Sequence, residues 1–239
     1  MKKLATALTS VALLLTVGTS ALASEASISP KGNLVVEESV NNGVKVYTVS
    51  GEGSKADASN LLNNYQAQKQ LNSQRDISQS EISPMGTAWT CYSGQTVIAY
   101  GSSVDAKNTT TVNNFCSGVD LLTFPFETKY RSAEKGSQQA FWGGSTPFRA
   151  DKIVLKQTTK FTGVAFSVAA PPGGSASSDT AVWESEPMLN EYVVNVDRPR
   201  VEAKTSAWTS GWIDETQVID GSDIYIGSTI YRPQSVINF

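Results

Sequence analysis

Apolar and polar residues alternate along most of the chain after residue 85. In the segment 120–131, Leu122 and Phe124 fall on one face of an extended chain and Thr123 falls on the other. A period of two is typical of strands with one buried face. Similar runs, separated by Gly, Pro, Ser and Asn, occur at 95–101, 152–158, 161–169, 180–184, 191–197, 200–208 and 223–231. Without helical patterns between them, these runs predict an all-β domain at 86–239, an antiparallel β-sandwich of about ten strands.

The preceding segment, 24–85, has a different texture, rich in Ser, Asn, Gln and Glu and poor in large aromatic residues. Within it, the β-type runs 34–40 and 44–49 flank the glycine-containing sequence 41–43, which predicts a β-hairpin. Spaced apolar residues among polar helix formers predict a weakly amphipathic helix at 56–76. We therefore expect 24–85 to be a polar accessory segment or a prosegment.

The first 23 residues have the features of a secretory signal peptide. Lys2 and Lys3 precede a mostly apolar, nearly uncharged run, and small residues at 21–23 predict cleavage between Ala23 and Ser24. Polar Thr and Ser residues interrupt the run, whereas a membrane anchor needs about 18 to 20 strongly apolar residues. The sequence thus predicts a secreted, extracellular protein without stable membrane insertion after cleavage.

Charge narrows the choice of partners. The chain holds 19 basic and 22 acidic residues, and removal of the leader takes away two lysines, which leaves a formal charge of −5. The sequence has no cluster of Lys and Arg residues that would bind phosphate groups, so neither nucleic acid nor an anionic membrane surface is an expected partner.

Cysteine and histidine usage narrows the chemistry. Cys91 and Cys116 are the only cysteines, and in an exported protein such a pair predicts one disulfide. The chain has no histidine, which excludes Ser-His-Asp triads, Cys-His pairs and His-ligated zinc sites. Phosphate-binding and dinucleotide fingerprints are also absent. We therefore expect neither a cofactor nor a metal site.

Carboxylates offer the remaining catalytic route. Glu184 and Glu186 lie two residues apart, so a strand would point both side chains to one face, where mutual repulsion raises one pKa and produces a general acid. The run 183–187 is similar to the Trp-x-x-Glu stretch of secreted glutamic peptidases, which are histidine-independent β-sandwiches that pair a Glu with a Gln. That resemblance implies a hydrolase, although it identifies no matching Gln. A polar strand face in solvent is the simpler interpretation of the pair.

Two further features carry weaker signals. Asp220 and Asp223, separated by Gly and Ser, provide two oxygen ligands where Ca²⁺ needs six to eight, so a turn before the 223–231 strand is expected instead. Phe141 and Trp142 stand beside two glycines in the polar stretch 132–150, where a loop would expose them as a ligand platform. Packing in the core is the alternative for these two rings.

The function these observations favour is a secreted, non-catalytic binding domain. Its ligand would be an extracellular glycan or protein recognised through the loops 136–150 and 170–179, with Phe141 and Trp142 as contacts. A histidine-independent hydrolase acting through Glu184 or Glu186, similar to a glutamic peptidase or a glycosidase, is the alternative from a different class. A secreted toxin or bacteriocin-like factor is also compatible with export and composition.

Overall fold

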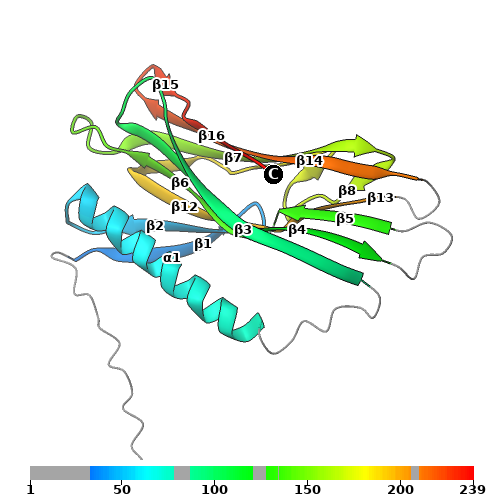
Figure 1. Ribbon diagram of the computed structural model, residues 1–239. Helices are drawn as coiled ribbons and strands as arrows, with labels where there is room; N and C mark the ends of the chain where they lie inside the picture. The colour runs from blue at the N-terminus through cyan, green and yellow to red at the C-terminus, as the bar shows by residue number, and fades with distance from the viewer. Residues whose placement is uncertain (1–32, 78–86, 121–127, 134, 206–209) are drawn as a thin grey trace, which may run out of the picture.

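The structure, a computed structural model, shows an antiparallel β-sandwich with one helix outside it (Figure 1). It describes residues 33–77, 87–120, 128–133, 135–205 and 210–239. Long strands on the two sheets bury their alternate side chains against each other, as the period-two pattern predicts. The all-β sandwich predicted from the sequence is therefore confirmed.

Sheet A runs in the order β1-β2-β12-β6-β4-β5-β13-β8, with β3 on the free side of β4. The pairing register of β12 with β6 continues without a shift into that of β13 with β5. Arg198 lies opposite Gly136, and three residues later Val201 lies opposite Ala133. The four short elements are therefore two long strands, each interrupted once. The bounds are β1 Val35–Asn41, β2 Val44–Ser50, β3 Thr87–Tyr100, β4 Ala106–Asp120, β5 Thr128–Ala133, β6 Gly136–Trp142, β8 Phe166–Val168, β12 Val193–Arg198 and β13 Val201–Thr205.

Sheet B is built around β7 and β14, which pair along almost their whole length. Its order is β15-β14-β7-β10-β9, with β11 also on β7 and β16 also on β14. The bounds are β7 Ala150–Val164, β9 Ser175–Ala176, β10 Thr180–Glu184, β11 Met188–Glu191, β14 Trp212–Ile226, β15 Thr229–Tyr231 and β16 Gln234–Asn238.

One predicted strand is wrong. Asp120 ends β4 and faces Thr128, the first residue of the antiparallel β5, so the two ends of the segment 120–131 belong to different strands. Residues 121–127 lie outside the described residues.

The predicted hairpin is present and belongs to the sandwich. Asn42 and Gly43 join β1 to β2 with positive φ angles of 45° and 74°, the conformation that a two-residue hairpin turn of type I′ requires. β2 pairs with β12, and Val44 and Val46 are buried in the core between the sheets. In the described residues, the hairpin of the predicted accessory segment is thus a structural part of sheet A.

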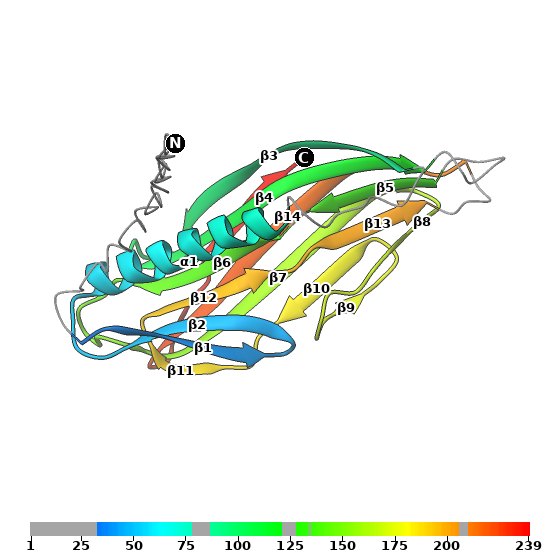
Figure 2. The same cartoon turned by 90° about the horizontal axis from the view of Figure 1, so that it is seen from below.

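Helix α1, Lys55–Ile77, matches the predicted helix and covers the outer face of sheet A (Figure 2). Ser54 caps its N-terminus, since the Ser54 hydroxyl accepts a hydrogen bond from the Asp57 amide at 3.1 Å. Ala58 and Leu62 are buried against Tyr47 and other residues of the sheet. Among the described residues, no helix is both long enough and apolar enough to cross a membrane.

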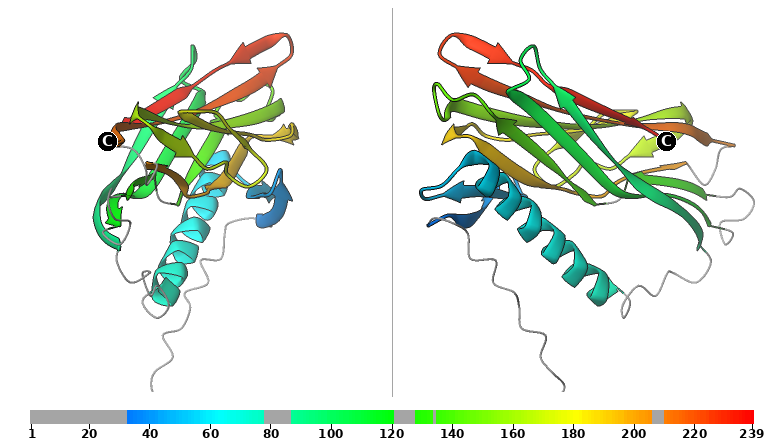
Figure 3. Two further views of the ribbon diagram at one scale, coloured as in Figure 1. Left: turned by 90° about the vertical axis from the view of Figure 1, so that its right-hand side faces the viewer. Right: turned by 60° about the vertical axis from the view of Figure 1, so that its left-hand side comes forward.

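The sandwich core is apolar at both ends and polar in the middle. One end packs Trp142, Ile153, Leu155 and Trp183 against valines of β2 and β12. The other end contains Phe161 and its neighbours. Between them lies a layer of buried polar side chains, described below. Figure 3 shows the two sheets from the side, with α1 outside sheet A.

The predicted disulfide is confirmed. Cys91 of β3 and Cys116 of β4 are directly opposite each other in the antiparallel register, with 4.1 Å between their Cα atoms, and they are bonded. The bond therefore fixes β3, which lies at the side of sheet A, to β4, the one described strand with which it pairs.

Candidate functional site

The site begins where the chain passes from one sheet to the other. β7 ends in sheet B at Val164, and β8 begins at Phe166 and pairs with β13 in sheet A. Ala165 makes the corner with a φ of 53°, a left-handed conformation that is uncommon for a residue with a Cβ atom. Near this corner β7 still pairs with β14, but its pairing with β10 ends at Lys160, which leaves space on that side of β7.

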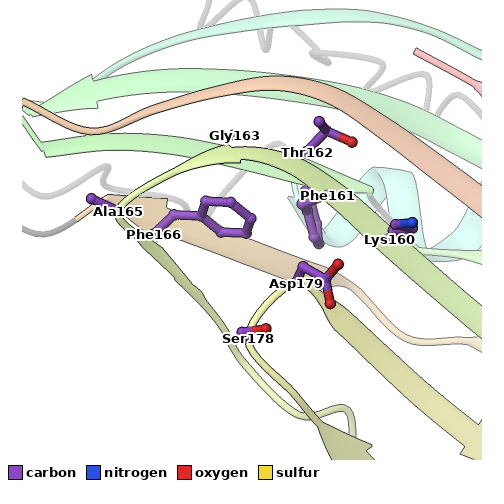
Figure 4. A pocket seen from close by; sticks show the side chains of 8 residues that line it. All are labelled: Lys160, Phe161, Thr162, Gly163, Ala165, Phe166, Ser178 and Asp179. Carbon is purple, nitrogen blue, oxygen red and sulfur yellow. The ribbon is translucent and has the colours of Figure 1, made fainter.

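The other wall of this space comes from the chain before β10. β10 begins at Thr180, which pairs with Lys160, and the Phe161 amide donates a hydrogen bond to the Asp179 carbonyl at 2.8 Å. Beyond that bond, the chain at Ser178 diverges from β7. The result is a pocket of about 420 Å³ (Figure 4), lined by Lys160, Phe161, Thr162, Gly163, Ala165, Phe166, Ser178 and Asp179.

An aromatic ring and a carboxylate face the same space in this pocket. The side chains of Phe161, Phe166 and Asp179 gather between β7 and the chain before β10, while Thr162 points away (Figure 4). Phe161 is buried and Phe166 is half-buried. Asp179 Oδ1 accepts a hydrogen bond from the Thr180 hydroxyl at 3.0 Å, which orients the carboxylate. The pocket therefore presents an apolar surface next to a strong hydrogen-bond acceptor.

The charged groups of the lining are one lysine, Lys160, and one carboxylate, Asp179. Among the described lining residues, Asp179 is the single carboxylate, so the pocket lacks the second acid that hydrolysis by paired carboxylates needs. Sequence reasoning had singled out the loop 170–179, which supplies Ser178 and Asp179. It had not singled out Phe166, because a phenylalanine in an alternating strand has the pattern of a core residue.

Glu184 and Glu186 lie on one face, as their spacing predicts, and that face is exposed. Buried Trp183 and Ser185 alternate with them. Glu184 Oε2 lies 3.9 Å from Lys156 Nζ on the neighbouring strand, and the Glu186 amide donates to Asn41 Oδ1 at 2.8 Å. Neither glutamate lines the pocket.

Phe141 and Trp142 do not lie on an exposed loop, so that expectation is wrong. Both belong to β6. Trp142 is only 4 % exposed, and its indole N–H donates to the Pro147 carbonyl at 2.9 Å. Phe141 is half-buried on the outer face of sheet A, below the Lys107 ammonium. The polar sequence before them is typical of a loop, but Gln138 is buried inside the sandwich.

A buried ion pair lies in the middle of the sandwich and was not predicted. Asp220, expected in a turn, lies inside β14, and Arg198 Nε of β12 donates to its Oδ2 at 3.2 Å across the two sheets. Both side chains are almost fully buried. Burial raises the pKa of Asp220, and Arg198 opposes that change. Buried neighbours that complete the layer are Asn108, Thr110, Gln138, Gln157, Thr159, Ser222 and Ser235.

A second group of charges fixes α1 to sheet A. Lys69 Nζ of the helix lies 3.8 Å from Glu38 and 3.7 Å from Asp197, and Tyr47 donates to Asp197 at 3.1 Å. Burial raises the pKa of Asp197, whereas a hydrogen bond from Lys45 lowers the pKa of Glu38. Both carboxylates face Lys69, the cation that α1 contributes, so they have a structural role in holding the helix on the sheet.

Glu191, at the end of β11, gives the protein a predicted pH dependence. Burial raises its pKa from 4.5 to about 7, although Arg149 lies 3.6 Å away. Because the folded state holds this proton more tightly than the unfolded state, its contribution to stability is complete below pH 4.5 and is lost as pH rises through about 7. We expect Glu191→Gln to be more stable than the wild type at pH 8 by about 1 kcal/mol, after allowance for solvent screening.

Chemical denaturation from pH 4 to pH 8 measures this effect, with the exposed Glu186→Gln as the matched control. The difference between Glu191→Gln and the wild type should grow with pH, while the control curve stays parallel to the wild type. A constant difference for Glu191→Gln over the whole range would contradict the assignment.

The described residues thus include the pocket at the β7–β8 corner, an exposed pair of glutamates, and the charged groups around Arg198, Lys69 and Glu191. No group of three or more Cys, Asp or Glu in the described ranges is placed to hold a metal ion. Comparison of the chain with protein-family models, with curated proteins and with solved structures finds no match.

Proposed function

We propose that this protein is an exported, non-catalytic binding module that takes a neutral glycan in the pocket at the β7–β8 corner. The observation that carries the proposal is the placement of the half-buried Phe166 ring beside the Asp179 carboxylate in one open pocket. Phe166 has no acid–base group, and Asp179 has no second carboxylate beside it in the lining with which to form a catalytic pair.

The chemistry of a sugar matches this pair of groups. The C–H face of a pyranose ring packs on an aromatic ring, and its hydroxyl groups donate to a carboxylate. The Ser178 hydroxyl, which is exposed at the rim, adds a donor and an acceptor. A volume of about 420 Å³ falls within the range of about 300 to 1,000 Å³ of small-molecule sites. The lining carries one cation, Lys160, and one carboxylate, Asp179, so it has no net charge, which suits a neutral sugar.

Export is supported by the sequence. The leader expected at residues 1–23 and the cleavage site between Ala23 and Ser24 lie outside the described residues. A disulfide-bonded pair of cysteines is typical of oxidising, extracytoplasmic environments. An extracellular glycan is then the ligand that such a protein would meet.

Titration calorimetry with a panel of neutral oligosaccharides tests the pocket. We expect Asp179→Asn, which preserves the shape of the side chain, to weaken binding roughly tenfold or more. Phe166→Ala should weaken it by a similar factor through loss of stacking. Phe141→Ala removes an equally half-buried phenylalanine from sheet A and is the matched control, with affinity unchanged.

Three results would contradict the proposal. Loss of affinity in Phe141→Ala alone would move the site to the outer face of sheet A. Unchanged affinity in both pocket variants would remove the pocket from consideration. Turnover of a peptide or glycan at acidic pH that disappears in Glu184→Gln or Glu186→Gln would establish the hydrolase instead.

A further inference from the structure

Strand β3 is a long, open edge of sheet A. It has 14 residues and, among the described residues, pairs only with β4. Tyr92, Ile98 and Tyr100 are 58 %, 53 % and 58 % exposed. Figure 2 shows β3 along the side of sheet A, while α1 packs on β1, β2 and β12. The outer side of β3 therefore presents a row of backbone donors and acceptors to its surroundings.

The composition of β3 differs from that of the other sheet edges. Its sequence from Thr87 to Tyr100 contains no charged residue and no proline. Edge strand β1 has half its length and carries Glu37 and Glu38. The other peripheral strands β8, β9, β11, β15 and β16 have five residues or fewer. Charge, proline and short length are the devices that prevent edge strands from pairing with another chain, and β3 has none of them.

We propose that β3 pairs with β3 of a second copy of this chain, antiparallel and about a two-fold axis, so that sheet A continues across a dimer. A strand without charges faces its own copy without placing like charges opposite each other. The mature chain has 17 basic and 22 acidic residues, a formal charge of −5, which disfavours contact through the acidic parts of the surface, whereas the uncharged edge adds no such repulsion. Self-complementary contacts of this kind are what a two-fold interface requires.

The disulfide prepares this edge for pairing. Cys91 lies in the first half of β3 and is bonded to Cys116 of β4, so this part of the strand is held on the sheet before a partner arrives. Pre-ordering a segment lowers the conformational entropy lost on association. This inference does not depend on the pocket, which lies between β7 and the chain before β10.

Symmetry fixes which residues meet. A two-fold axis perpendicular to the sheet places each residue opposite a partner residue on the same face, so the two positions differ by an even number. Complete overlap of β3 with its copy then sets Ser93 opposite either Ser93 or Gln95 of the second copy. Ser93 is exposed, so a charge placed there is solvated in the monomer and, in the dimer, lies directly opposite its equivalent or diagonally next to it.

Sedimentation velocity of the full mature chain tests the proposal. We expect a concentration-dependent dimer for the wild type and a dissociation constant at least roughly tenfold higher for Ser93→Lys and for Ser93→Glu. Ser39→Lys places the same charge on an exposed position of edge strand β1 and should dimerise like the wild type. An equimolar mixture of Ser93→Lys and Ser93→Glu should regain the dimer, because opposite charges then face each other.

Each remaining outcome overturns the proposal. A wild type that stays monomeric at all concentrations shows that the edge does not pair with a copy. A dimer insensitive to Ser93→Lys uses another surface. A mixture of the two charged variants that stays monomeric, although each is folded by circular dichroism, excludes the two-fold antiparallel arrangement.

Discussion

Replacing Arg198 with methionine is expected to lower the free energy of unfolding by about 3 to 5 kcal/mol. Arg198 donates to the Asp220 carboxylate at 3.2 Å and to the Thr159 hydroxyl at 2.6 Å, with both charged groups almost fully buried between the sheets. Without the guanidinium, the Asp220 carboxylate remains in the interior with no opposing charge. Urea denaturation at neutral pH measures the loss.

Two further variants separate the ion pair from simple packing. Arg198→Met combined with Asp220→Leu should recover most of the lost stability, because two apolar side chains remove the charge that is costly to bury. The loss in Arg198→Met alone should shrink at acidic pH, where Asp220 takes up a proton and becomes neutral. A double variant that is less stable than Arg198→Met would show that the layer needs its polar groups for another reason.

Removing the disulfide is expected to cost about 3 to 4 kcal/mol in the chain-entropy model. The bond between Cys91 and Cys116 closes a loop with a sequence separation of 25. It also holds β3, which among the described strands pairs only with β4, so its loss should expose the amides of β3 to exchange before those of β4.

The measurement is the unfolding midpoint of Cys91→Ser/Cys116→Ser in denaturant, together with hydrogen exchange. The wild type treated with a reductant is the second arm, because it keeps both side chains and breaks only the bond. Equal stability of the oxidised and reduced proteins would contradict the expected constraint.

Much of the fold could be predicted because it depends on local pattern. The alternation of 152–158 identifies the centre of β7, and the Asn-Gly pair identifies the hairpin between β1 and β2. The cysteine pair was sufficient for the disulfide. The strand and the hairpin are decided by residues that are close in sequence. The disulfide follows because the chain has only two cysteines.

The interior of β14 could not be predicted in the same way. Its inward positions include Val218 and Ile224, but also Asp220 and Ser222, so the hydrophobic period is lost where the polar layer begins. Asp220 gains a partner for its buried charge only when folding brings Arg198 of the opposite sheet next to it. Taken without Arg198, the four residues 220–223 have the composition of a turn, and this is why a turn is expected there from the sequence.

The pocket depends equally on long-range arrangement. Phe166 follows a left-handed corner at Ala165, and Asp179 precedes β10, so the two side chains meet only after the chain has crossed between sheets. Phe141 and Trp142 illustrate the reverse error. A pair of aromatic residues beside glycines is typical of an exposed loop, but these two belong to β6, and side chains of the opposite sheet bury Trp142 in the core.

The site itself is tested most directly by nuclear magnetic resonance titration of the isotope-labelled mature protein with neutral oligosaccharides. We expect amide signals of Gly163, Phe166, Ser178 and Asp179 to shift progressively and to saturate together, while those of Phe141 remain in place. Shifts centred on Phe141, or no shift with any member of the panel, would contradict binding of a glycan at the β7–β8 corner.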